Sequence, residues 1–460
     1  MIPPLRAFSK PLLLFVAAII AARPASPQSQ TGSADPGTPG GQTGATTWLQ
    51  PVEELNRSLP SWLEFGGGYR TRLEGQNGIK FGETDDSYVL SRLRLNFLIK
   101  PTPWFSLFGE TEDSRIFFNQ HLPGGLPYQN TWDIRQAYGE LGSSTEGWID
   151  VIIGRQVLGF GKQRLIGPSD WSNTGRTFDA VRVDLHQSGY KISLFASSVV
   201  TGGEGVIDHH VQGNNLHGIY STFSHLVPRA TVEPYVLWRL TPPGQAFTQD
   251  PAPGALNEVT TGFRWAGKIP EDFDYEVEMA RQSGSLGLKS IAAWAGHWEL
   301  GKTFRNRRAS PRLLAAVNYA SGTRDPNSGK WGTFDQLYPS SHDKLGLADQ
   351  VGWRNVEQFR LGVEEKAGKK WKLKQTYEDF WLATRGDGLY NSSGKLVIPA
   401  SAGATSRHIG QEIDALAEYQ PNRAMTFGFG YARLFAGQFL KQTSGGKDYN
   451  YPFVYGAYRF

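Results

Sequence analysis

Hydrophobic and polar residues alternate along most of this chain with a period of two. Within residues 89–99 the apolar and polar positions take opposite faces: Val89, Leu93, Leu95, Phe97 and Ile99 against Arg92, Arg94 and Asn96. The same alternation recurs in residues 180–186, 258–269 and 273–279. A period of two is typical of β-strands with one apolar face. The chain is therefore predicted to be all-β.

Strand length separates the two architectures that share this pattern. The alternating segments exceed the ~5–6 residues usual in globular proteins and reach the about 9–11 residues that a tilted strand needs to cross a bilayer. Aromatic residues cluster near the segment ends, among them Trp62, Trp104, Trp148 and Trp371. Such girdles mark both interfaces of outer-membrane barrels. The pattern therefore favours a transmembrane barrel over a soluble sandwich.

The connections between the predicted strands alternate between short and long. Tight turns are predicted at residues 101–103, 187–189, 227–228, 269–271, 367–369 and 421–422, and long polar loops at 75–86, 117–130, 161–177, 202–214, 241–255, 321–352, 384–406 and 436–449. Short periplasmic turns and long outer loops alternate in this way in outer-membrane barrels. We predict an antiparallel transmembrane β-barrel of about 18 strands between Trp62 and Phe460, with both termini on the periplasmic side.

The two ends of the chain carry sorting signals. Arg6 and Lys10 precede an apolar run at residues 11–22 that is too short to span a membrane. We therefore predict a signal peptide at residues 1–25, with an uncleaved membrane anchor as the alternative. Residues 26–60 are rich in Pro, Gly, Ser and Thr and are predicted to form a flexible periplasmic segment before a barrel domain at 61–460. The terminal Phe460 resembles the signature read by the barrel assembly machinery, which implies that machinery and outer-membrane lipid as partners.

Composition excludes several classes of function. The chain has no Cys, so it has no disulfides or thiolate metal sites. Its net charge of +4 includes Arg6, Lys10 and Arg23 of the leader, so it does not indicate a nucleic-acid partner. The one histidine pair, His209 and His210, follows Asp208, and neighbouring residues on a strand point in opposite directions. We expect no enzyme activity, no cofactor and no metal site.

The predicted inward faces are rich in charge. A barrel of this size leaves an aqueous lumen, and its inward positions carry many basic and several acidic residues: Arg70, Arg72, Arg92, Arg94, Arg182, Arg264, Lys268, Arg360, Lys372 and Lys374, with Glu64, Glu74, Asp184, Glu258, Glu364 and Glu378. The arginines concentrate in the first six predicted strands. Rings of Arg or Lys favour anions. An anion-selective channel is the function that this distribution favours, although most of these arginines, taken singly, are better explained as solvated lumen residues without a role in selectivity.

Three segments resemble a known family. They are "GRQVLGFGKQRLIGPSDWSNTGRTFDAVR" (154–182), "FDQLYPSSHDKLGLADQVGWRNVEQFRLG" (334–362) and "YEDFWLATRGDGLYNSSG" (377–394). Together they resemble the bacterial alginate-export outer-membrane channel family. That resemblance implies a monomeric barrel of eighteen strands with an arginine-lined constriction, located in the bacterial outer membrane. It also implies passage of an acidic polysaccharide of the polyuronate type.

The resemblance also implies a set of channel residues. They are Arg155, Arg164, Arg176 and Arg182 with Asp170 and Asp179, then Arg354 and Arg360 beside His342 and Lys344, and finally Arg70, Arg72, Arg92 and Arg94. A guanidinium holds a carboxylate by two parallel bonds, which suits uronate residues. Gly and Pro within residues 161–177 allow that loop to fold into the lumen. Two roles stay open for these arginines, selectivity or pinning of the loop, and a general or anion-selective diffusion porin for small acidic solutes is the alternative function.

Overall fold

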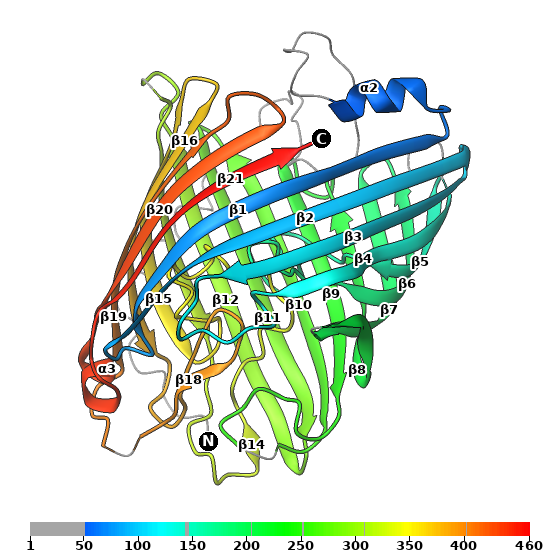
Figure 1. Ribbon diagram of the computed structural model, residues 1–460. Helices are drawn as coiled ribbons and strands as arrows, with labels where there is room; N and C mark the ends of the chain where they lie inside the picture. The colour runs from blue at the N-terminus through cyan, green and yellow to red at the C-terminus, as the bar shows by residue number, and fades with distance from the viewer. Residues whose placement is uncertain (1–50, 143–146, 204, 251–252, 308, 402) are drawn as a thin grey trace.

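Eighteen antiparallel strands form a closed barrel within the part of the chain that the structure describes (Figure 1). The structure is a computed structural model, and it describes residues 51–142, 147–203, 205–250, 253–307, 309–401 and 403–460. The barrel closes where β1 (Leu63–Ile79) pairs with β2 (Thr84–Thr102) on one side and with β21 (Tyr449–Arg459) on the other. The predicted all-β barrel of about eighteen strands is confirmed.

Each wall strand pairs with its neighbour along the chain. The remaining wall strands are β3 (Phe105–Phe117), β4 (Asn130–Gly142), β5 (Ile149–Gln156), β6 (Phe178–Gln187), β7 (Tyr190–Gly203), β8 (Val206–Phe223), β9 (Ala230–Thr241), β10 (Leu256–Ile269), β11 (Phe273–Leu286), β12 (Lys289–Thr303), β13 (Arg312–Ala320), β15 (Val356–Ala367), β16 (Trp371–Leu382), β19 (His408–Tyr419) and β20 (Met425–Ala436). The short elements β14 (Lys330–Trp331), β17 (Leu389–Tyr390), β18 (Leu396–Ile398) and α3 (Gln438–Thr443) lie within outer connections.

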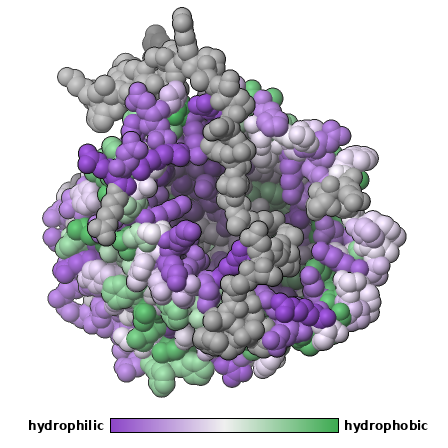
Figure 2. Space-filling model, turned by 90° about the horizontal axis from the view of Figure 1, so that it is seen from above, coloured by the Kyte–Doolittle hydropathy of each residue, from purple (hydrophilic) through white to green (hydrophobic). Residues whose placement is uncertain are grey.

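The alternating pattern separates the lipid-facing surface from the lumen. On β2 the side chains of Leu95 and Phe97 are 42% and 41% exposed, whereas Arg92 on the opposite face is 7% exposed. The same parity holds across the pairing partners, since Arg92 lies opposite Arg70 and Leu93 opposite Tyr69. Seen from the end that carries the C-terminus, hydrophilic residues line the central hollow (Figure 2). The apolar face of each strand therefore meets lipid and the polar face meets the lumen.

This division predicts a difference between neighbouring substitutions. Leu95→Arg places a charge against lipid and is expected to destabilise the barrel by up to about 2–4 kcal/mol, depending on its depth in the bilayer. Asn96→Arg places the same side chain in the lumen and is expected to change stability by less than about 1 kcal/mol. The free energy of unfolding in lipid vesicles, measured by urea titration, checks this. Equal losses for the two variants would contradict the assigned faces.

The connections at one end of the barrel are all short, whereas the other end carries the long ones together with three short ones, at residues 80–83, 204–205 and 287–288 (Figure 1). Two predicted long loops are corrected, because residues 75–86 and 202–214 belong mainly to strands. β1 and β2 are joined by residues 80–83, and β7 and β8 by residues 204–205. Gln76 and Asn77 still pair with Asp86 and Asp85. Strands that continue beyond the bilayer are solvated on both faces, so their polar composition resembles that of a loop.

The described part of the chain begins with a short helix. Helix α2 (Pro51–Ser58) occupies the end of the segment predicted to be flexible (26–60), while residues 1–50, including the predicted signal peptide, lie outside the described residues. Glu53 and Glu54 in its first turn favour the positive end of the helix dipole. Asn56 ties the helix to β1 by hydrogen bonds with the backbone of Phe65 at 2.7 and 2.8 Å. No helix of the described ranges has the length and apolar character needed to span a membrane.

Three long outer connections, residues 157–177, 321–355 and 383–407, fold into the lumen and share one apolar core. Leu165, Phe334, Trp353 and Leu389 come from these connections and are at most 4% exposed. They pack with inward-facing wall residues such as Phe380. Burial of apolar surface drives this packing. The barrel therefore contains an internal plug toward its outer end, and the candidate site lies where the plug meets the wall.

Candidate functional site

Two of the three connections that form the plug pair with each other. Ile166 in residues 157–177 forms a parallel bridge with Tyr338 in residues 321–355. The amide of Tyr338 donates to the Leu165 carbonyl at 2.8 Å, and the amide of Gly167 donates to the Tyr338 carbonyl at 2.9 Å. A Cβ atom at Gly167 would lie 2.4 Å from Oγ of Ser340. Glycine at this position is what permits the two connections to approach so closely.

A charged cluster joins the plug to strands β1 to β4. We call it the Asp170 cluster; it comprises Arg70, Arg72, Glu74, Arg92, Arg94, Glu110, Glu112, Arg135 and Asp170. Nη1 of Arg94 lies 2.6 Å from Oδ1 of Asp170, and Nη2 of Arg92 lies 3.3 Å from Oδ2. Arg70 and Arg92 also donate to the carbonyl of Asp170, at 2.8 and 2.9 Å. The alternation on β1 and β2 directs these arginines inward, toward the loop.

The Asp170 carboxylate is the exposed part of this cluster. Its side chain is 51% exposed, whereas those of Arg92 and Arg94 are 9% and 12% exposed. Partial burial opposes ionisation, but the guanidiniums of Arg92 and Arg94, with Arg135 and Arg70 behind them, hold the pKa of Asp170 well below its usual range. The five arginines of the cluster outnumber its four carboxylates by one. The plug therefore presents an exposed carboxylate, and the wall strands place an excess of positive charge directly behind it.

Trp171 anchors the tip of the loop beside this cluster. The guanidinium of Arg72 lies 4.1 Å from the Trp171 ring centroid, on its face, and also donates to the Trp171 carbonyl. His342 stacks on the ring with centroids 4.1 Å apart and an angle of 3°. Nδ1 of His342 lies 2.7 Å from Oδ2 of Asp349. Trp171 therefore holds residues 157–177 and 321–355 of the plug against the barrel wall, and His342 contributes to that contact.

Arg164 and Arg176 brace the plug from within. Nε of Arg164 lies 3.6 Å from Oε2 of Glu278 on β11, and the guanidinium lies 5.3 Å from the Trp353 ring centroid. Arg176 donates to the carbonyls of Gly167 and Pro339 at 3.3 and 2.9 Å. Burial lowers the pKa of Arg176 to about 10, so it stays charged at neutral pH. Of the two roles left open by the sequence, pinning describes the observed contacts of this pair.

Arg354 and Arg360 hold the second connection. Arg360 on β15 lies 3.2 Å from carboxylate oxygens of both Asp343 and Glu378. Arg354 donates to the carbonyl of Phe247 at 2.6 Å and lies 4.7 Å from the Tyr390 ring centroid. It therefore ties together three different outer connections. These two arginines, like Arg164, stabilise the plug.

Lys344 differs from its neighbours because it forms no ion pair among the described residues. Burial, opposed by Asp343 and reinforced by Arg164 and Lys374, lowers the pKa of Lys344 to about 8. A lysine loses its positive charge as the pH rises through its pKa. We expect the positive charge of the plug at this position to fall between pH 7 and pH 9, as measured by the reversal potential under a salt gradient across a bilayer that contains the protein. Lys344→Met should remove this pH dependence, and persistence of the full pH dependence in that variant would contradict the assignment.

Arg155 and Asp179 do not face the lumen. They face each other on β5 and β6, with Nε of Arg155 2.8 Å from Oδ1 of Asp179. Each shares its strand face with an outward residue: Ile153 (52% exposed) precedes Arg155 by two positions, and Val181 (47%) follows Asp179 by two. Arg182 has the opposite parity and faces inward, where its Nε lies 3.3 Å from Oδ2 of Asp184. Their position on the outer face corrects the expectation that Arg155 and Asp179 line the channel.

Several inward charges were missing from the sequence-based site set. Arg135 on β4 contacts Glu110 at 2.5 Å and Glu112 at 3.5 Å. The pairing register between β3 and β4 shifts at Arg135. The period-two alternation is interrupted there, so the sequence pattern did not show that Arg135 faces inward. Arg239 on β9 pairs with Asp335 of the plug. Its alternation with Tyr235 and Leu237 on one face is readable in the sequence.

The described part of the chain contains no typical metal-binding cluster. No group of three or more His, Cys, Asp or Glu residues in the described part of the chain is arranged to hold a metal ion. His210 instead contacts Asp179, with 3.1 Å between Nδ1 and Oδ2. The arrangement as a whole contains carboxylate-binding guanidiniums and a plugged lumen, and it supports passage and binding of solutes.

Comparisons with known proteins agree on the type of protein. The family model for alginate export matches residues 61–454. A search of the curated proteins finds no match. Among solved structures, the chain is similar to the outer membrane protein OprD from Pseudomonas aeruginosa, at 9% identity and a TM-score of 0.57, covering 86% of this chain and 93% of that one.

Two further structures from the same organism show the same likeness. Pseudomonas aeruginosa OpdK, solved with vanillate, matches at 9% identity and a TM-score of 0.57, covering 86% of this chain and 98% of that one. Pseudomonas aeruginosa OccD3 (OpdP) matches at 11% identity and a TM-score of 0.56, covering 86% and 91%. At these identities the likeness establishes the fold, an outer-membrane barrel of the porin type.

Proposed function

Because the chain belongs to the alginate export family and is a channel of the bacterial outer membrane rather than an enzyme, we propose that it passes an anionic polysaccharide of the polyuronate type. Arg70, Arg92 and Arg94 line the proposed path together with the remaining arginines of the Asp170 cluster. A monomeric barrel suffices for this passage.

The observation that supports the proposal most is the position of the Asp170 carboxylate. It lies 2.6 Å from Arg94 and 3.3 Å from Arg92, and half of its side-chain surface is exposed. A uronate residue carries the same carboxylate group. We propose that passing uronates exchange with Asp170 for these guanidiniums. Binding would then be favourable but weak, because each uronate displaces an existing charge-assisted bond, and weak repeated binding is what fast passage requires.

The plug favours a second candidate function. Residues 157–177, 321–355 and 383–407 pack into a shared apolar core inside the barrel, which restricts the lumen for an extended polymer. An anion-selective diffusion porin for small acidic solutes needs a narrower path and is consistent with the porin-type fold. Polymer export additionally requires that the plug move aside.

Efflux from proteoliposomes distinguishes the two functions. Vesicles containing the purified protein are loaded with uronate oligomers and with neutral glucan oligomers of equal length. Export of a polyuronate predicts faster loss of the uronate oligomers, and a double Arg92→Glu/Arg94→Glu variant should abolish that preference. Retention of all oligomers beyond disaccharides, with free passage of small organic acids, would favour the porin instead.

Two further proposals concern delivery of the protein. Residues 1–25 are proposed to direct export across the inner membrane, and residues 26–60 to precede the barrel on the periplasmic side. Phe460 is proposed to be read by the barrel assembly machinery. In the folded barrel its amide donates to the Gly67 carbonyl at 3.1 Å, at the seam between β21 and β1. Phe460→Ala should therefore lower the amount of protein in the outer membrane.

A further inference from the structure

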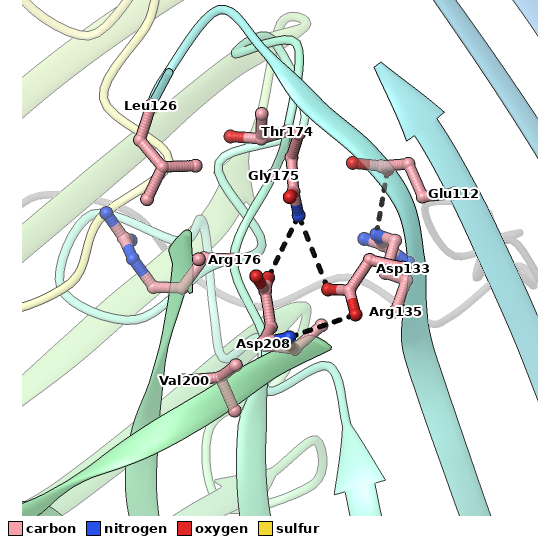
Figure 3. A pocket seen from close by; sticks show the side chains of 12 residues that line it. Glu112, Leu126, Asp133, Arg135, Thr174, Gly175, Arg176, Val200 and Asp208 are labelled. Atoms are coloured by element: carbon pink, nitrogen blue, oxygen red, sulfur yellow. Dashed lines mark hydrogen bonds and ion pairs between the residues drawn. The ribbon is translucent and has the colours of Figure 1, made fainter. Parts of the chain in front are cut away.

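A polar pocket near the outer end of the barrel lies beside the Asp170 cluster and shares Glu112 and Arg135 with it. It is formed by β4, the β7–β8 hairpin and residues 174–177 (Figure 3). β5 and β6 have only 8 and 10 residues, whereas β7 and β8 have 14 and 18. The barrel wall therefore extends less far toward the outer end at β5 and β6. The longer β7–β8 hairpin passes over the ends of these two strands and contacts β4. The backbone amide of Asp208 donates to Oδ1 of Asp133 at 3.1 Å, which joins the hairpin to β4.

Two carboxylates meet in this pocket. Asp133 and Asp208 point toward each other in Figure 3. Nδ2 of Asn130 lies 3.3 Å from Oδ2 of Asp133 and 3.0 Å from Oδ2 of Asp208. The amide of Gly203 donates to Oδ1 of Asp208 at 3.1 Å. Neither carboxylate has an ion pair with a basic side chain of the described residues.

The nearby arginines are already engaged elsewhere. Arg135 lies 2.5 Å from Glu110 and 3.5 Å from Glu112. Arg176, which also lines the pocket, donates to two backbone carbonyls of the plug. Two facing carboxylates repel each other, which makes ionisation of the second one less favourable unless a cation lies close. A bound cation, or a proton shared between Asp133 and Asp208, would relieve this repulsion.

Asn130 supplies an independent indication of a ligand. This side chain lines the pocket and is 4% exposed, and its Oδ1 has no hydrogen-bond partner. A buried amide oxygen without a partner is costly. Rotation of the amide plane exchanges Oδ1 and Nδ2, and would place the oxygen beside both carboxylates. Asn130, Asp133 and Asp208 then offer oxygen ligands from two separate elements.

We propose that this pocket binds a calcium ion through Asp133, Asp208 and Asn130. Calcium takes six to eight oxygen ligands in flexible geometry, and carboxylates, amide oxygens, backbone carbonyls and water all serve. Backbone atoms of Thr174, Gly175 and Gly202 border the same pocket and can complete the set. Its lining contains neither Cys nor His, which disfavours softer metals. The ion would clamp the hairpin to β4 over the ends of β5 and β6, a role that does not depend on the transported solute.

Calcium titration of the purified full-length protein tests this site. Isothermal calorimetry of chelator-treated protein in detergent should show one calcium ion per chain, with a dissociation constant on the order of 10⁻⁴–10⁻³ M, as in extracellular modules. The double variant Asp133→Asn/Asp208→Asn should weaken binding at least about tenfold. Glu83→Gln, which removes an 81% exposed carboxylate at the outer end, is the matched control and should bind as the native protein does.

Thermal unfolding provides a second measurement that needs no variant. The native protein should unfold at a higher temperature in millimolar calcium than in a chelator, and sodium at equal ionic strength should not reproduce the shift. Absence of both calcium-dependent heat and a calcium-dependent shift would overturn the proposal in favour of a shared proton. Undiminished calcium binding by the folded double variant would overturn it as well.

Discussion

Asp170→Asn is expected to strengthen the anion preference of the channel and to tighten its block by uronate oligomers about tenfold. The substitution leaves the shape of the side chain nearly unchanged but removes the charge that occupies Arg92 and Arg94. An incoming uronate then no longer competes with a tethered carboxylate. A tenfold change corresponds to about 1.4 kcal/mol, which is close to the lower end of the about 1.5–3 kcal/mol of a single hydrogen bond to a charged group.

A matched control lies on the opposite face of the barrel wall. Asp179→Asn removes a carboxylate that also contacts a guanidinium, with 2.8 Å between Arg155 Nε and Asp179 Oδ1, but the pair faces outward. Reversal potential and block should be unchanged in this variant. If Asp170→Asn weakened the block, or if Asp179→Asn had the same effect, the exchange of carboxylates at the Asp170 cluster would be ruled out.

Arg164→Met is expected to loosen the plug and to raise the single-channel conductance. The change removes the guanidinium that contacts Glu278 at 3.6 Å and the Trp353 ring at 5.3 Å. Glu278 is 4% exposed, so it would be left as a buried carboxylate without this partner. Breaking a buried ion pair from one side costs about 3–5 kcal/mol, which is enough to shift a packed connection toward an open state. Planar-bilayer recordings measure the conductance directly.

The comparison for this variant is Arg433→Met. Arg433 also forms an ion pair, with 2.8 Å between its Nη2 and Oδ2 of Asp448, but its side chain is 43% exposed and the pair lies between β20 and the final outer connection. An exposed pair is screened by solvent and its loss has little effect on stability. Conductance should therefore stay at the native value. Unchanged conductance in Arg164→Met would show that the plug does not depend on this brace.

Strand periodicity was the most informative property of the sequence. A step of two residues from Arg92 reaches Arg94 and then Asn96, which places both on the inward face. Leu95 lies between them and faces outward, as the structure shows. The same count from Val181 places Asp179 on the outer face, although the family motif had suggested a channel role for it. Where parity and motif disagreed, parity was correct, because a side chain on a strand has only two directions available.

The internal plug was only partly predictable. Gly and Pro in residues 161–177 indicated that this connection could fold inward, but its pairing with residues 321–355 depends on contacts such as Ile166 with Tyr338, far apart in sequence. No local pattern encodes such a contact. For the same reason the sequence left open whether Arg164 selects anions or braces the loop. Arg135 was missed because a strand irregularity interrupts the period-two pattern at that point.

The measurement that tests the central claim most directly is the current through single native channels in a planar bilayer with uronate oligomers added to one side. The account predicts an anion-selective reversal potential under a salt gradient, and a concentration-dependent block that is stronger for uronate oligomers than for neutral glucan oligomers of equal length. Cation selectivity, or no block by the uronate oligomers, would contradict it.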